Sequence, residues 1–359
     1  MRSWLSKLDY GVLLGWAGLM VVGLIAIYST THGPAAEYLP TTAKQNFERQ
    51  LMWGGISLFV IFLCLVLPTR FYQNIAFPSY IGSLGLLAAT IVFGTEVNGA
   101  TSWLDLGGGI RIQTGEFAKV GTVLAVAALL ALRRPNSGVI RYGGGATLLL
   151  LLPAVLLLLQ NDTGTALVFV GLIPIMLFWS GLPLYILALM LSPAIAGYFA
   201  VVDMPIAIGF SIVFILGVFL ATRRKWAVAA AAVFTLGTIA VAGVAISQLQ
   251  PHQVARIVSF TNPEAEEFRT GVGYHLVQSK AAIGSGGILG KGFMEGTQTQ
   301  GAYIPEQSTD FVFSIIGEEF GFVGGMVVIF LYGFLLIRLV QLGTRVKHPI
   351  ASMMAAGAA

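Results

Sequence analysis

The stretch VLLGWAGLMVVGLIAIY, residues 12–28, contains no charged side chain. A helix of about 20 such residues crosses the hydrocarbon core of a bilayer, so this run predicts a membrane-spanning helix. Arg2 and Lys7 precede the run, and no small-residue cleavage pattern follows it. We therefore interpret the run as a retained span rather than a signal peptide, with the N-terminus in the cytoplasm.

The composition of the chain predicts the same class of protein. Of its 359 residues, 56% are hydrophobic and 10% are charged, and the mean hydropathy is +0.84. Soluble domains carry about 25% charged residues, so we expect an all-α polytopic integral membrane protein. Apolar runs predict ten spans, at residues 12–28, 51–67, 81–93, 120–132, 146–159, 166–179, 184–201, 205–221, 226–246 and 311–342.

The charged residues are distributed by sign. With the N-terminus inside, alternation of the spans places most acids outside and the main groups of cations in the cytoplasm, as the positive-inside rule requires. These cations are Arg70, Arg133, Arg134, Arg141, Arg223, Arg224, Lys225, Arg338, Arg345 and Lys347. The net charge of +4 is thus a signal of topology, and we expect no nucleic-acid partner.

A long predicted external loop, residues 247–310, concentrates polar chemistry. Within it, PHQVARIVSF (251–260) and GYHLVQSKAAIG (273–284) place apolar residues on one helical face, which predicts amphipathic helices on the membrane surface. The segment GSGGILGKGFMEGTQTQG (284–301) departs from a phosphate-binding P-loop, because Gly292 follows Lys291 where Ser or Thr is required. Its glycines either let the backbone contact a ligand or form tight turns.

Two further polar clusters lie in short predicted external segments. Gln113, Glu116 and Lys119 are spaced by three residues near the start of a helix, so Glu116 and Lys119 are positioned to form an ion pair. The pair would either anchor the helix end or belong to a functional site. Asp162, in QNDTGTAL (160–167), lies in a short turn between two spans, where a helix cap is the usual role of an aspartate.

The stretch YIPEQSTDFVFSIIGEEFG, residues 303–321, places acids where a polar loop meets an apolar run. We expect Ser308 to be an N-cap and Asp310 to lie in the first helical turn, where the helix dipole stabilises a carboxylate by about 0.3–1 kcal/mol. Asp310 is then either a stabilising charge or a functional group. Glu318 and Glu319 would lie about 12 Å further along the helix, and acids at such depth are functional-site hypotheses by default.

Residues 271–324, GVGYHLVQSKAAIGSGGILGKGFMEGTQTQGAYIPEQSTDFVFSIIGEEFGFVG, closely resemble the signature region of a known family. It is the shape, elongation, division and sporulation (SEDS) family of membrane peptidoglycan glycosyltransferases. Likewise, WLDLGGGIRIQTGEFAK (103–119) is similar to the family pattern of Trp, Gly, Ile-Gln-Pro-Ser-Glu-Phe and Lys, and QNDTGTAL is similar to Gln-Pro-Asp-Leu-Gly-Thr-Ala. The glycine-rich segment is more similar to the rod-elongation branch, RodA, than to the division branch, FtsW.

The resemblance implies a SEDS-like helical bundle with site residues on its external face. The essential aspartate of the family's Pro-Glu and Thr-Asp-Phe motif maps onto Asp310, its partner lysine maps onto Lys119, and Glu116 completes the expected catalytic group. The expected substrate-binding residues are Gln113, Trp103, Asp162, Arg256, Gln278, Lys291 and Glu306.

The sequence departs from the family pattern in three ways. Thr114 and Gly115 replace Pro-Ser, and Asn161 replaces the proline of Gln-Pro-Asp. The family has ten spans with its long loop after the seventh, so residues 202–246 are interpreted as a two-helix insertion in a single membrane domain, 1–359. The family's last two helices carry a Leu-Pro, Gly, Pro-Leu-Pro, Ser-Tyr-Gly-Gly motif that is not found here, so we expect the C-terminal helices to be truncated.

The implied reaction joins a sugar hydroxyl of one lipid-linked disaccharide, lipid II, to the anomeric carbon of another and expels a polyprenyl pyrophosphate. Asp310 is then either the general base for the hydroxyl or a ligand of a divalent cation, Mg²⁺ or Mn²⁺, and the sequence leaves both open. Arg256, Lys280, Lys291 or that cation would neutralise the pyrophosphate. The four histidines lack the spacing of a metal site, and no other cofactor is expected.

The alternative function is a lipid II flippase or transporter, which Glu318 and Glu319 keep open because transporters place acids near the bilayer midplane. The resemblance also implies a class B penicillin-binding protein, a transpeptidase with one membrane helix, as the partner. The expected location is the bacterial cytoplasmic membrane, where the spans contact membrane lipids and the active site faces outward.

Overall fold

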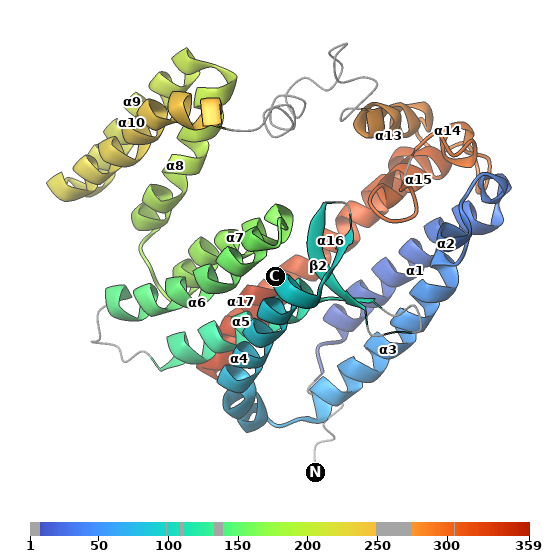
Figure 1. Ribbon diagram of the computed structural model, residues 1–359, viewed down its shortest axis with the longest axis horizontal. Helices are drawn as coiled ribbons and strands as arrows, with labels where there is room; N and C mark the ends of the chain where they lie inside the picture. The colour runs from blue at the N-terminus through green and yellow to red at the C-terminus, as the bar shows by residue number, and fades with distance from the viewer. Residues whose placement is uncertain are drawn as a thin grey trace. The chain divides into compact units, whose positions relative to one another are not determined.

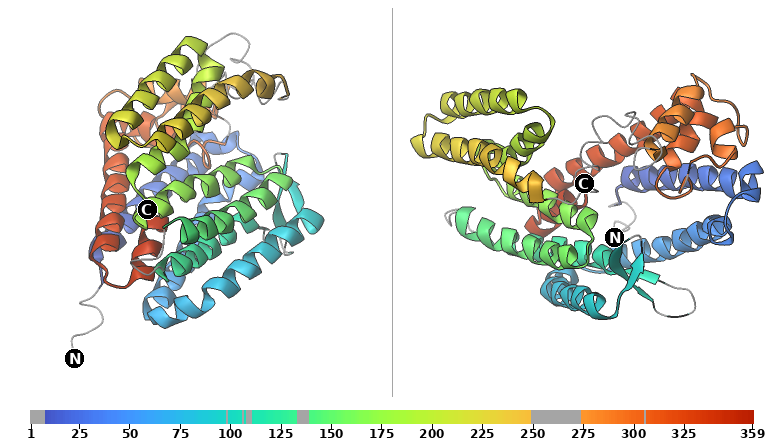
Figure 2. Two further views of the ribbon diagram at one scale, coloured as in Figure 1. Left: turned by 90° about the vertical axis from the view of Figure 1, so that its left-hand side faces the viewer. Right: turned by 45° about the horizontal axis from the view of Figure 1, so that its top comes forward.

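The computed structural model describes residues 8–97, 99–105, 107, 111–132, 139–248, 274–304 and 306–359 (Figure 1). They form two compact units, one made of Met1–Val66 and Val244–Arg338 and the other of Leu67–Gly243 and Leu339–Ala359. Within the described ranges, nine helices are long and apolar enough to cross a membrane. Helices dominate every view (Figure 2), which confirms the prediction of an all-α polytopic membrane protein. Arg256 and the predicted helix at 251–260 lie outside the described residues.

The first unit is built on a long N-terminal helix. Asp9 caps this helix by accepting hydrogen bonds from the amides of Gly11 and Val12, and it also forms a 2.9 Å ion pair with Arg338. The elements of the unit are α1 (Tyr10–His32), η2 (Pro34–Glu37), α2 (Thr41–Lys44), α3 (Asn46–Val66), α13 (Tyr274–Ser285), α14 (Thr297–Gln300), α15 (Val312–Glu319) and most of α16 (Gly321–Arg345). Gly15 and Gly18 of α1 let Leu335 and Leu331 of α16 approach closely, as small residues do between membrane helices.

The predicted span at 311–342 is not one helix but two, because the chain breaks between α15 and α16 at Phe320. The glycine-rich loop inserts its backbone into the break. The amides of Lys291 and Gly292 donate to the last carbonyls of α15, and the first amides of α16 donate to loop carbonyls at Gly287 and Ile288, all at 2.9–3.1 Å. The last carbonyls of α15 and the first amides of α16 lack partners within their own helices, and the loop backbone supplies those hydrogen bonds.

The loop glycines allow this close backbone packing, a role that the sequence analysis did not predict. A Cβ at Gly286 would collide with the carbonyl of Gly317, and one at Gly290 would collide with the carbonyl of Glu319. Gly290 also has φ +86°, a conformation that favours glycine.

The second unit packs five helices around a buried apolar core and carries a small sheet. The core includes Leu87, Val126, Leu150, Phe169 and Met176. The sheet is antiparallel in the order β1-β2-β3, and sequence reasoning did not predict it. The elements are α4 (Thr69–Phe93), β1 (Thr95–Val97), β2 (Ala100–Asp105), β3 (Arg111–Gln113), α5 (Thr114–Ala131), α6 (Val139–Leu159), α7 (Thr163–Trp179), α8 (Leu184–Val202), α9 (Met204–Thr222), α10 (Lys225–Gln248) and α17 (Pro349–Ala358).

Candidate active site

Asp310 lies in a turn that precedes α15, so its predicted place in the first turn of the helix is wrong. The carbonyl of Glu306 accepts hydrogen bonds from the amides of Thr309 and Asp310 at 3.1 and 3.0 Å, which closes a separate turn. Glu306 adopts the left-handed φ of +51° that this turn requires. The N-cap of α15 is Phe311, one residue after Asp310.

Ser308, the predicted cap, holds the turn from another direction. Its hydroxyl accepts a 2.8 Å hydrogen bond from the side-chain amide of Asn46 at the start of α3. Gln307 and Ser308 are buried, whereas Asp310 and Glu306 are exposed. The turn therefore buries its centre and presents two carboxylates to its surroundings.

The Asp310 side chain lines a cavity of about 290 Å³ between α1, α15 and α16. Apolar side chains such as Leu19, Val22 and Phe313 form much of its wall. Among the described residues, no hydrogen bond or ion pair engages the Asp310 carboxylate. The geometry thus leaves this acid available to a ligand, next to an apolar surface.

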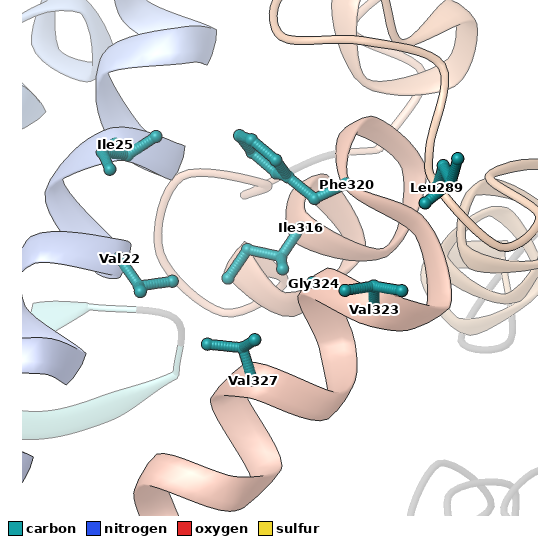
Figure 3. A pocket seen from close by; sticks show the side chains of 8 residues that line it. All are labelled: Val22, Ile25, Leu289, Ile316, Phe320, Val323, Gly324 and Val327. Atoms are coloured by element: carbon teal, nitrogen blue, oxygen red, sulfur yellow. The ribbon is translucent and has the colours of Figure 1, made fainter.

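A second cavity of the same unit, of about 360 Å³, is lined only by Gly324 and by the apolar side chains that Figure 3 labels. Val22 and Ile25 of α1 face Ile316 and Phe320 across it (Figure 3). Val22 and Ile316 line both cavities, so the two are neighbours. The apolar surface beside Asp310 is therefore extended, as an apolar chain would require.

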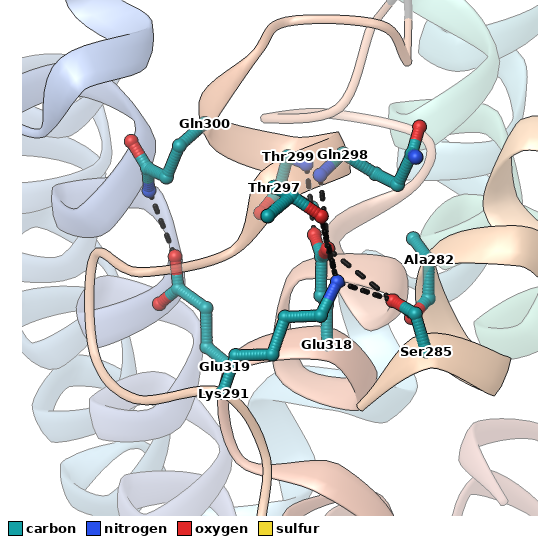
Figure 4. Close-up of polar contacts among 9 residues, drawn as sticks. All are labelled: Ala282, Ser285, Lys291, Thr297, Gln298, Thr299, Gln300, Glu318 and Glu319. Carbon is teal, nitrogen blue, oxygen red and sulfur yellow. Dashed lines mark hydrogen bonds and ion pairs between the residues drawn. The ribbon is translucent and has the colours of Figure 1, made fainter. Parts of the chain in front are cut away.

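Glu318 is fully buried at the end of α15, a helix that is not among the nine candidate spans. Several hydrogen bonds and an ion pair engage its carboxylate (Figure 4). Its carboxylate forms a 2.7 Å ion pair with Lys291 and accepts the amides of Gln298 and Thr299 at 2.9 and 2.8 Å. Burial alone would raise the pKa of Glu318, but hydrogen bonds from Gln298 and Lys291 outweigh it and lower the pKa from 4.5 to about 2. Glu318 is thus a buried anion that fastens α14 to α15.

Lys291, one of the predicted substrate-binding residues, is already engaged in this network. Besides Glu318, its ammonium group donates hydrogen bonds to the hydroxyls of Ser285 and Thr297, each at 2.7 Å. These contacts join α13, the glycine-rich loop, α14 and α15. The Lys291–Glu318 pair was not predicted, because the two residues lie 27 positions apart and no local spacing relates them.

Glu319 is buried beside Glu318 but has different partners. Its carboxylate accepts hydrogen bonds from Ser29 at 2.5 Å and from Gln300 at 2.8 Å (Figure 4 shows the contact with Gln300). The Gln300 side chain also accepts the amide of Ala35 at 3.0 Å. Burial raises the pKa of Glu319. This cluster joins α1, η2, α14 and α15, and the sequence carried no signal for Ser29 or Gln300.

The second unit contains five of the predicted site residues, in two groups. Glu116 and Lys119 form the predicted ion pair at 2.8 Å, with their side chains 56% and 30% exposed. Asp162 caps α7 by accepting the amide of Thr165, which confirms its predicted role as a cap. Its other oxygen accepts a 3.3 Å hydrogen bond from Gln113. Gln113 pairs with Trp103 across β2 and β3, so the sheet helps to hold Gln113 beside Asp162.

The remaining predicted residues belong to the first unit. Asp310 and Glu306 share one turn, and Lys291 belongs to the Glu318 network. Gln278 lies half-buried on α13, in the helix predicted at 273–284. Within the described part of the chain, no three His, Cys, Asp or Glu side chains group together as a metal site would require.

Comparison with known proteins identifies the family. The model of the FtsW, RodA and SpoVE cell cycle proteins matches residues 11–206 and 194–359. The chain belongs to this family. The match confirms the family that the three sequence motifs predicted.

Individual relatives match along almost the whole chain. The peptidoglycan glycosyltransferase RodA of Treponema pallidum is 30% identical, and the match covers 98% of this chain and 86% of the relative. The peptidoglycan glycosyltransferase MrdB of Escherichia coli K12 is 29% identical, with 98% and 80% covered.

Solved structures share the fold. A structure described as a peptidoglycan synthase complex that coordinates polymerization and crosslinking contains a chain with a TM-score of 0.65 and 29% identity, with 97% of this chain and 82% of that chain covered. The rod shape determining protein RodA of Thermus thermophilus has a TM-score of 0.57 and 25% identity, with 97% and 79% covered.

Proposed function

We propose that this family member is a peptidoglycan glycosyltransferase that polymerises lipid II into glycan strands during cell-wall elongation. The observation that carries the proposal is the Asp310 turn. It presents a carboxylate without a described partner at the wall of an apolar cavity, in a chain whose relatives bear this activity in their names. A polymerase of lipid-linked sugars needs both a polar reacting group and a surface for the lipid.

In the proposed reaction, the acceptor hydroxyl attacks the anomeric carbon of the donor sugar. The hydroxyl loses its proton to Asp310, the new carbon–oxygen bond forms, and the bond to the polyprenyl pyrophosphate breaks, so that the electron pair leaves with the pyrophosphate. The cavities lined by Val22 and Ile316 would accept the apolar part of the lipid. Lys119 and Glu116 remain proposed catalytic residues. The proposed substrate-binding residues are Gln113, Trp103, Asp162, Arg256, Gln278, Lys291 and Glu306.

A divalent cation fits the same carboxylate. Mg²⁺ is commonly bound by one or two carboxylates plus substrate phosphates and keeps several waters, so a cluster of three acids is not required. Asp310 and Glu306 would supply the protein's share of such a site, and the cation would neutralise the leaving pyrophosphate.

The contacts of the two glutamates among the described residues weaken the transporter alternative. That alternative depended on Glu318 and Glu319 as intramembrane acids with a functional role. Both carboxylates are instead buried and held by loop and helix partners.

We also propose the cellular setting. The chain is a multi-pass membrane protein, and we place it in the bacterial cytoplasmic membrane with its N-terminus inside and Asp310 outside, on the basis of its cation distribution. We propose a class B penicillin-binding protein as its partner. The similarity to a chain from a complex that coordinates polymerization and crosslinking supports this partner.

The test is polymerisation of fluorescent lipid II by the purified chain, with a class B penicillin-binding protein present. We expect Asp310→Asn to lower the rate by about 10²–10⁴-fold, the usual contribution of a general base. Glu37→Gln, which removes an exposed acid of the same unit, is the matched control and should keep full activity. Wild-type activity that persists in Asp310→Asn would contradict the proposal, and loss of activity on chelation that Mg²⁺ restores would make the residue a metal ligand.

A further inference from the structure

An apolar groove lies between α8 and α9 in the second unit. It has a volume of about 550 Å³, within the range of about 300–1,000 Å³ that ligand sites occupy. Leu184 and Tyr185 line it from α8, and Phe210, Phe214 and Gly217 line it from α9. Ala227 and Ala231 of α10 belong to a small core with residues of both helices, and this core shares Tyr185, Phe214 and Val218 with the groove.

One end of the groove carries three consecutive cations. Arg223, Arg224 and Lys225 follow directly after Thr222, which lines the groove, and all three side chains are exposed. The guanidinium carbon of Arg224 lies 6.0 Å from the centre of the Tyr185 ring, and its Nη1 lies 3.5 Å from the Tyr185 hydroxyl. Tyr185 therefore holds one cation at the mouth of the groove.

Among the described residues, no ion pair engages these three cations. Between residues 163 and 248 the one acid is Asp203, which caps the opposite end of α9. Trp226 stands beside Tyr185, with ring centres 6.1 Å apart, and such aromatic side chains are typical of the membrane–water interface. The groove thus combines an apolar channel, an interfacial aromatic pair and a positive end that forms no ion pair within the described part of the chain.

We infer that this groove binds an anionic phospholipid, with its phosphate on the cations of the α9–α10 turn and an acyl chain along Phe210, Phe214 and Gly217. Basic pockets between membrane helices bind anionic headgroups in this way. Each cation near the membrane surface contributes about 1 kcal/mol to the free energy of binding to anionic lipids. The positive-inside rule places the turn at the cytoplasmic leaflet, where anionic lipids attract basic segments. A neutral apolar partner, such as a single membrane helix, would leave the three charges without a counterion.

The first experiment blocks the groove while leaving its charges intact. A Cβ at Gly217 meets no atom within 4 Å, so Gly217→Leu should fill the groove without displacing the protein. Gly209→Leu is the matched control, because its Cβ is equally free but the residue does not line the groove. Purified protein is equilibrated with equal amounts of phosphatidylglycerol and phosphatidylcholine in detergent, and the retained lipids are quantified by mass spectrometry.

We expect the wild type and Gly209→Leu to enrich phosphatidylglycerol and Gly217→Leu to lose the enrichment. In a second comparison, the double variant Arg224→Gln/Lys225→Gln should lower the enrichment of phosphatidylglycerol at least about fivefold. The control Arg345→Gln/Lys347→Gln removes two other exposed cations of this unit and should leave the enrichment unchanged. Elution as a single species in gel filtration establishes that each variant is folded. Equal retention of the two lipids by the wild type, or loss of enrichment in both double variants, would overturn the inference. Capture of a partner's membrane helix in place of lipid would also overturn it.

Discussion

Replacement of Lys291 by methionine should destabilise the protein far more than the same replacement of Lys119. Both lysines form ion pairs with glutamate, at 2.7 and 2.8 Å, so their geometry is closely matched. The pairs differ in burial: the side chain of Glu318 is 0% exposed, whereas that of Glu116 is 56% exposed. The comparison sets a buried pair that belongs to a hydrogen-bond network against an exposed pair of nearly equal length.

The magnitude follows from the electrostatics of Glu318. A pKa of about 2 against the ordinary 4.5 corresponds to about 3 kcal/mol in favour of the charged form, at 1.36 kcal/mol per pKa unit. The amides of Gln298 and Thr299 would still bind the carboxylate after the lysine is lost. We therefore expect Lys291→Met to cost about 2 kcal/mol, somewhat less than the full penalty for an unpaired buried charge. The exposed pair should contribute less than about 1 kcal/mol.

The assay is unfolding in detergent micelles, followed for Lys291→Met, Glu318→Gln, the double variant and Lys119→Met. The two substitutions in the buried pair share one interaction, so the loss in the double variant should be smaller than the sum of the single losses by about 1–2 kcal/mol. Additive losses, or equal losses for Lys291→Met and Lys119→Met, would refute the reasoning.

The Glu318 carboxylate should also make the free energy of unfolding depend on pH. The pKa of Glu318 is lowered in the folded protein, so its contribution is complete above pH 4.5 and is lost as the pH falls through about 2. The free energy of unfolding of the wild type should decline across this interval more steeply than that of Glu318→Gln. Parallel curves for the two proteins would contradict the assignment.

Two other contacts give predictions of their own. Gly290→Ala should cost more than about 2 kcal/mol in thermal unfolding, because its Cβ would collide with the Glu319 carbonyl at a φ of +86°, while Gly284→Ala, with open space around its Cβ, should cost nothing. Asn46→Ala removes the hydrogen bond to Ser308 and should cost about 1 kcal/mol of stability. It should also lower kcat for polymerisation, and an unchanged kcat would show that the bond does not position the Asp310 turn.

The parts of this molecule that could be predicted are those that local sequence determines. Apolar runs predict spans because lipid leaves a chain no other way to satisfy its backbone. The Glu116–Lys119 pair follows from a spacing of three on a helix, and the cap at Asp162 from its place before an apolar run. Each of these inferences needs only a few neighbouring residues.

The rest depends on residues far apart in sequence. The break at Phe320 exists because loop residues some thirty positions earlier supply its hydrogen bonds, and nothing in the apolar run itself reveals it. Asn46 and Ser308 are 262 positions apart, and that bond takes the Ser308 hydroxyl away from the helix end it was expected to cap. Such contacts have no periodicity, so a single sequence does not disclose them.

The three acids of the segment at 310–319 show how environment assigns roles to similar side chains. Glu318 is balanced by a lysine and two backbone amides, so its protonation would disrupt contacts that hold the loop. Glu319 is buried, and its Oε1 accepts hydrogen bonds from Ser29 of α1 and Gln300 of α14. Asp310 is exposed beside an apolar cavity, and a ligand or cation can bind its carboxylate without breaking any contact found among the described residues. The acids at depth in the helix therefore stabilise the frame, and the acid ahead of the helix is the one placed to react.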